Sequence, residues 1–257
     1  MRRWLIALAC AVAAVGQVTS QTVVSAQVTN LDVVPERNRI DATMTNTGQR
    51  AISAFYVQAF AMRDGEKIPC GGHGQDMIDG SDPMPGTQSL AHVARHWVMP
   101  GENRKMEIFP GKNCSQLPLG EVKVEVRGIL FDDGTEEGSD RMMEMAMRVR
   151  KMRATERLKW IPAFSALHQA SDLTTESLKL YQAIVQANFT ADLDPGRAAD
   201  EGIAKTVRTE LQNLALAIHE WAARRQGPAK LEQDPMMNWR LMDLEQRTTR
   251  LVKGAGL

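Results

Sequence analysis

The chain has few cysteines and few aromatic residues: three Cys, and 5% Phe, Trp and Tyr, among 257 residues. It carries no net charge, because 31 basic residues balance 31 acidic ones, and this argues against nucleic acid as the main partner. After Gly16 no stretch approaches the roughly 18 consecutive apolar residues of a membrane-spanning helix, so we expect a chain that is not transmembrane. No segment reaches the specificity of a catalytic motif, and the sequence predicts no cofactor.

The start of the chain has the build of a secretory signal peptide. The basic pair Arg2-Arg3 precedes an apolar run from Trp4 to Gly16, and small and polar residues follow it. We predict cleavage before Gln21, which makes residues 1–20 the signal peptide, with cleavage after residue 26 as the alternative. The protein is therefore expected to be secreted or periplasmic, in the bacterial envelope.

Export bears directly on the cysteines. Cys10 lies in the predicted signal peptide, so Cys70 and Cys114 are the pair that an oxidising compartment would bond. His73 follows Cys70 at a spacing that also suits a zinc site. Oxidising conditions favour the disulfide over that alternative.

Two regions of different character follow the signal peptide. Residues 21–137 hold 16 acidic and 11 basic residues, whereas residues 138–257 hold 15 and 18. In the first region, Ile40–Thr45 and Glu121–Phe131 alternate apolar and polar residues, as strands with one solvated face do. Six or seven such strands predict an antiparallel β-sandwich. The segment 71–88 is dense in Gly, Asp and Pro, and we expect it to be a long loop.

Three turn and strand signals occur in order along the first region. Asn46-Thr47-Gly48 precedes an Ile-Ser-Ala-Phe-Tyr strand, Pro100-Gly101-Glu102 forms a turn, and Gly128–Thr135 comes near the end. In these features residues 21–137 resemble the immunoglobulin-like domains of many bacterial secreted proteins. The resemblance covers about the first half of the mature chain and implies an immunoglobulin-like sandwich, a fold rather than an activity.

The second region changes to the helical period. Three to four helices are expected in residues 138–257, and Pro162 should kink or end the first of them. Asp234 followed by Pro235 predicts the start of the last helix. The longest helix, about 198–225, carries an apolar stripe that something must cover, made of Ile203, Val207, Leu211, Leu214, Ile218 and Trp221. The fold class is therefore α+β, and the sequence leaves open whether the helices pack together, on the sandwich or on another chain.

Two groups of charged residues are candidates for binding. The densest basic stretch could meet an anionic partner or be a solvated helix face, and it comprises Arg148, Arg150, Lys151, Arg153, Arg157 and Lys159. Asp76, Asp79 and Asp82 supply oxygen ligands that calcium could use, although no known calcium-loop spacing is matched and such clusters are mostly turns. Ser165, His168 and Asp172 share a helix face but lack a local oxyanion hole, so we expect no catalysis from them.

The function favoured by these observations is that of a non-enzymatic binding or interaction protein. Its partner is expected to be a protein, and self-association through the helices stays open. One alternative is an envelope hydrolase or metal-dependent enzyme with loop-borne residues. Another is a structural envelope component that self-associates.

Overall fold

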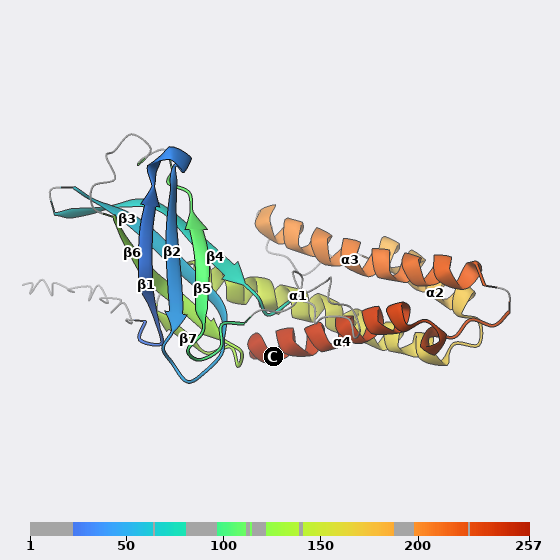
Figure 1. Ribbon diagram of the computed structural model, residues 1–257. Helices are drawn as coiled ribbons and strands as arrows, with labels where there is room; N and C mark the ends of the chain where they lie inside the picture. The colour runs from blue at the N-terminus through green and yellow to red at the C-terminus, as the bar shows by residue number, and fades with distance from the viewer. Residues whose placement is uncertain are drawn as a thin grey trace, which may run out of the picture.

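The computed structural model describes residues 23–63, 65–80, 97–111, 114, 122–138, 141–187, 198–225 and 227–257. Antiparallel sheets form the N-terminal half and four α-helices the C-terminal half, which makes the chain an α+β protein (Figure 1). The predicted signal peptide and Asp82 lie outside the described residues.

A three-stranded sheet contains β1 (Ala26–Val34), β2 (Arg39–Asn46) and β5 (Asn103–Ile108) in the order β1-β2-β5. Burial alternates strictly along β2, as the sequence pattern predicts. The short 3-10 helix η1 (Pro35–Arg37) joins β1 to β2, and Asn38 follows it with a left-handed φ of 45°.

A four-stranded sheet contains β3 (Ile52–Arg63), β4 (Glu66–Asp76), β6 (Val122–Phe131) and β7 (Glu136–Gly138) in the order β4-β3-β6-β7. The expected loop at 71–88 is wrong in its first part, because β4 continues to Asp76. Gly72 and Gly74 are tolerated there because the ring of Tyr56, on β3, covers them: a Cβ at Gly72 would lie 2.5 Å from the Tyr56 hydroxyl.

The two sheets enclose one hydrophobic core. Residues of both sheets that face it are almost fully buried, including Ile40, Met44, Phe55, Val57, Ile108, Ile129 and Phe131. Cys70 of β4 and Cys114 lie in the same core and are joined by a disulfide with an S–S distance of 1.98 Å. The bond ties β4 to the chain that follows β5, and so links an edge of each sheet.

The helices are α1 (Arg141–Ala166), α2 (Leu173–Gln186), α3 (Ala198–Ala223) and α4 (Pro235–Gly254), with 3-10 turns η2 (Leu167–Gln169) and η3 (Leu231–Gln233). Asp234 caps α4 as predicted, since its side chain accepts hydrogen bonds from Met236 and Met237 nitrogens. Pro162 does not end α1, which continues to Ala166. Pro162 has no N–H to donate to the Leu158 carbonyl, and Leu158 is an exposed residue of the helix.

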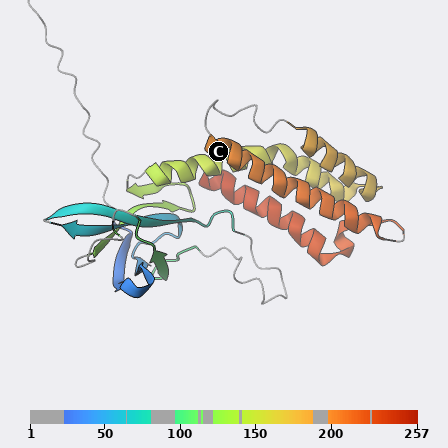
Figure 2. The same ribbon diagram turned by 90° about the horizontal axis from the view of Figure 1, so that it is seen from above.

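Four of the six residues in the apolar stripe of α3 are buried within the chain, and Ile203 and Trp221 are half-buried. Val207, Leu211 and Ile218 are at most 1% exposed, and Leu214 is 9% exposed. They share a second core with residues of α1, α2 and α4, and Figure 2 shows these helices side by side. The stripe therefore gives no reason to invoke a second chain. No helix among the described residues is long and apolar enough to cross a bilayer.

The helices attach to the four-stranded sheet. Ala54 of β3 and Leu130 of β6 point away from the inter-sheet core and pack against Met143 of α1. The outer face of the three-stranded sheet lies on the other side of the sandwiched core, toward the viewer in Figure 1.

Candidate functional site

The segment Asp76–Gly80, which begins with the last residue of β4, lies between the sheets and the helices. Met77 donates its N–H to the Ser53 carbonyl at 2.8 Å and packs in the inter-sheet core. The next residue, Ile78, packs instead with Ala154 of α1 and Leu251 of α4. Successive residues of this segment therefore belong to different hydrophobic clusters, and the segment connects the two halves of the protein.

Arg150 of α1 fixes the first residue of this segment. Its side chain is 0% exposed. The guanidinium binds both carboxylate oxygens of Asp76, at 3.0 and 2.8 Å, and also donates to Ser53 Oγ at 3.0 Å. The Ser53 hydroxyl lies 2.7 Å from the Phe131 carbonyl, so a buried charge on a helix is satisfied by groups on β3, β4 and β6. A bidentate arginine–carboxylate pair has high geometric specificity, so it fixes the position of α1 on the sheet.

Asp79 is the centre of a larger ionic cluster. Its carboxylate accepts hydrogen bonds from Arg153 and Arg157 of α1, at 3.0 and 2.9 Å, and from Arg247 of α4 at 3.4 Å. Arg157 and Arg247 also share Glu210 of α3, at 2.6 and 2.5 Å. Three helices and the segment after β4 thus meet through charged groups that are mostly buried.

The electrostatics of the cluster favour the charged forms. Burial acts to lower the pKa of Arg247, but the carboxylates of Glu210, Asp79 and Asp243 outweigh it and hold that pKa above its ordinary value. Arg250 of α4 adds a contact to a neutral group, since its guanidinium donates to the Gly80 carbonyl at 2.7 Å. The interface is therefore an ionic network in which α1 and α4 supply the arginine side chains.

The structure distributes the predicted basic stretch over different environments. Arg150 and Arg157 are buried in the network, and Arg153 is partly buried there. Arg148 pairs with Asp200 of α3, and Lys159 with Glu156 at 2.8 Å. Lys151 is exposed. The six residues therefore do not form one continuous basic surface.

The calcium candidates have arginine partners. Asp76 binds Arg150 and Asp79 binds three arginines, so their carboxylates are occupied within the chain. Among the described residues, no group of three or more His, Cys, Asp or Glu is placed to hold a metal ion. The sequence identified the aspartates and the arginines as separate candidates. It could not show that they pair, because they lie more than 70 positions apart.

The aligned Ser165, His168 and Asp172 do not converge. Ser165 donates to Glu245 at 2.5 Å, and His168 Nδ1 lies 3.5 Å from Glu232. Asp172 caps α2 by accepting the Thr175 N–H at 3.0 Å. Each side chain has a separate structural contact.

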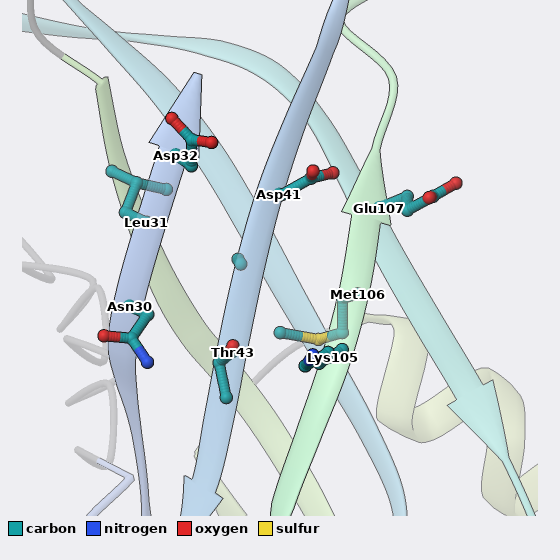
Figure 3. A pocket seen from close by; sticks show the side chains of 9 residues that line it. Asn30, Leu31, Asp32, Asp41, Thr43, Lys105, Met106 and Glu107 are labelled. Atoms are coloured by element: carbon teal, nitrogen blue, oxygen red, sulfur yellow. The ribbon is translucent and has the colours of Figure 1, made fainter. Parts of the chain in front are cut away.

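The outer face of the three-stranded sheet forms an open hollow of about 590 Å³ that both charged and apolar side chains line (Figure 3). Strand pairing arranges the outward side chains in rows. Thr43 of β2 lies opposite Asn30 of β1 and Lys105 of β5. In a lower row, Thr45 Oγ1 hydrogen-bonds Thr29 Oγ1 at 3.0 Å and Asn103 Oδ1 at 2.7 Å.

One row of this face consists of carboxylates. Asp41 of β2 lies directly opposite both Asp32 of β1 and Glu107 of β5. Arg39 offsets part of this charge, with contacts of 2.7 Å to Asp41 and 2.7 Å to Glu107. Asp32 is exposed and has no ion-pair partner in the part of the chain that the structure describes. This row has no local signature in the sequence, because only the register of β1 and β5 on β2 brings the three carboxylates together.

Comparison with known proteins identifies no family. No family model and no curated protein matches the chain. A solved X-ray structure of a hypothetical protein from Peptoclostridium difficile 630 is similar at 13% identity, over 48% of this chain and 90% of that one, with a TM-score of 0.28. A similarity at that TM-score carries no argument about fold or function.

Proposed function

We propose that this chain is an exported, non-enzymatic binding or interaction protein of the bacterial envelope. In this proposal residues 21–137 form an immunoglobulin-like sandwich that presents the binding surface. The helical region of residues 138–257 is fastened to its four-stranded sheet. The signal-like start of the chain and the disulfide between Cys70 and Cys114 support export.

The row Asp32, Asp41 and Glu107 carries the proposal. Like charges directly opposite each other on neighbouring strands destabilise a sheet. Proteins keep such locally unfavourable arrangements chiefly where function requires them. The row lines the hollow of the three-stranded sheet, on the side that the helices leave open.

The chemistry of the row favours a cationic group. Carboxylates accept charge-assisted hydrogen bonds from lysine ammonium and arginine guanidinium groups. Asn30 and Thr43, one row away, add neutral hydrogen-bonding groups beside the carboxylates. A basic segment of a protein partner, lying across β1, β2 and β5, matches this surface.

A binding measurement tests this function. A short fluorescein-labelled oligolysine peptide should bind the mature protein, with an affinity that falls as salt is added because exposed charges are screened. The double substitution Asp32→Asn and Glu107→Gln removes two of the three carboxylates and should weaken binding about tenfold or more, as expected if each lost charge contact contributes ~1 kcal/mol.

The matched control is Asp132→Asn, which removes one acid that pairs with Lys253 of α4, away from the hollow. It should leave the affinity unchanged, and an oligoglutamate peptide should not bind. Equal weakening by Asp132→Asn would show that only net charge matters. No binding, or binding unaffected by the double substitution, would contradict the proposed surface.

A further inference from the structure

We propose that processing of the exported chain takes place upstream of Val23, because Val24 and Ser25 are a docked part of the mature fold. The inference rests on the proposed export. It decides between the two cleavage positions that the sequence offers, before Gln21 and after Ala26.

Glu137 of β7 holds the start of the described chain from one side. Its carboxylate accepts the N–H groups of Val24 and Ser25, at 3.1 and 2.9 Å, and the Ser25 hydroxyl at 2.6 Å. Burial acts to raise the pKa of Glu137, but the hydrogen bonds from Ser25 and Val24 outweigh it and hold that pKa below its ordinary value of 4.5. The hydrogen bonds that hold Val24 and Ser25 therefore also stabilise the ionised form of this carboxylate.

The turn after β2 holds the same residues from the other side. The Ser25 carbonyl accepts the N–H groups of Thr47 and Gly48, at 3.0 and 3.2 Å. The Thr47 hydroxyl donates to the Val24 carbonyl at 3.2 Å. Gly48 allows this approach, since a Cβ there would lie 2.7 Å from Ser25 Cβ. A residue larger than glycine would push the strand away.

Neighbouring residues add apolar contacts. Ala26 is buried in the inter-sheet core and pairs with Asn46, and Val23 packs against the same core. Gly138, with φ at 86°, leaves room for Val23, because a Cβ there would lie 2.7 Å from Val23 Cγ2. Cleavage after Ala26 would remove all these contacts, leave Glu137 without its three donors and shorten β1.

Intact mass of the exported protein gives the first test. The full chain, made in a bacterium that secretes or exports it, should have lost residues up to a point before Val23, with Gln21 as the expected first residue. An N-terminal glutamine can close to pyroglutamate: its amine nitrogen bonds to the side-chain amide carbon and ammonia leaves, so the mass is read with and without one ammonia. A chain beginning at Gln27 would overturn this inference while leaving export standing. An unprocessed chain that stays in the cytoplasm would contradict export itself.

A stability measurement tests the docking without relying on export. Two chains, beginning at Gln21 and at Gln27, are produced directly under oxidising conditions and melted. The shorter chain should lose roughly 5 °C or more in Tm, or fail to fold, because several hydrogen bonds and buried groups are lost. Equal Tm values would overturn the inference.

Glu137→Gln supplies the matched comparison. In the chain beginning at Gln21 it should lower the Tm, since an amide cannot accept all three donors. In a folded chain beginning at Gln27 its effect should be much smaller, because the donors are already gone. An equal effect in both chains would show that Glu137 acts through Arg50, 3.9 Å away, and would contradict the proposed anchoring.

Discussion

Arg150 carries a fully buried charge on a helix that the sequence alone marks as a basic, solvent-compatible stretch. Taking a guanidinium out of water costs several kcal/mol, and Asp76 and Ser53 must offset that cost. Removing one partner of such a pair leaves the other charge buried and unpaired. The position of α1 on the sheet thus depends on individual side chains as well as on apolar packing.

Asp76→Asn should therefore destabilise the protein by about 3 kcal/mol or more, the usual cost of breaking a buried ion pair. Chemical denaturation of a chain that begins at Gln21 measures this change. Asp132→Asn is a matched control, because both aspartate side chains are 28% exposed, whereas Arg150 is 0% exposed and Lys253, the partner of Asp132, is 62% exposed. The control should cost less than about 1 kcal/mol. Similar losses of stability for the two variants would mean that the burial of Arg150 does not increase the cost of removing its partner.

At the scale of elements, the buried residues of the α3 stripe belong to the core of the helical region. Residues of the other three helices share a core with its buried residues, so these residues are covered within the molecule. Sequence periodicity identified the stripe and its residues, but it could not identify what covers it, since helices of the same chain and of a partner present the same apolar chemistry.

Leu214→Asp places a charge in this core and should unfold the helical region, with a loss of more than about 3 kcal/mol. Circular dichroism should show lost helix content, and sedimentation should show no change in association that precedes unfolding. The neighbouring exposed residue offers the control Asn213→Asp, which should leave the spectrum intact. A Leu214→Asp protein that keeps its helices but loses an oligomer would contradict the intramolecular covering.

The sequence predicted those elements whose signals lie within a few neighbouring residues. Alternation identified β2 and β6, and Asp234-Pro235 identified the start of α4, because these signals act within a few residues. β4 was partly missed because glycine is disfavoured in strands, and the compensating ring of Tyr56 belongs to another strand. Pairings such as Asp79 with Arg247 depend on the tertiary fold and have no local signature.

At the scale of the whole molecule, the ionic network joins the two predicted regions. The change in pattern near residue 138 coincides with the end of β7 and the start of α1 at Arg141. Yet Asp76 and Asp79, from the first region, are bound by arginines of the second. We therefore expect the sheets and helices to form one cooperative unit, with the outer face of the three-stranded sheet left open for a partner.

Differential scanning calorimetry of a chain that spans residues 21–257 tests this central claim most directly. The account predicts one transition whose calorimetric enthalpy equals its van't Hoff enthalpy, the signature of a single cooperative unit. Asp79→Asn, which weakens the network that joins the regions, should lower the Tm of the whole transition. Two separate transitions in the unmodified chain, one for the sheets and one for the helices, would contradict the claim.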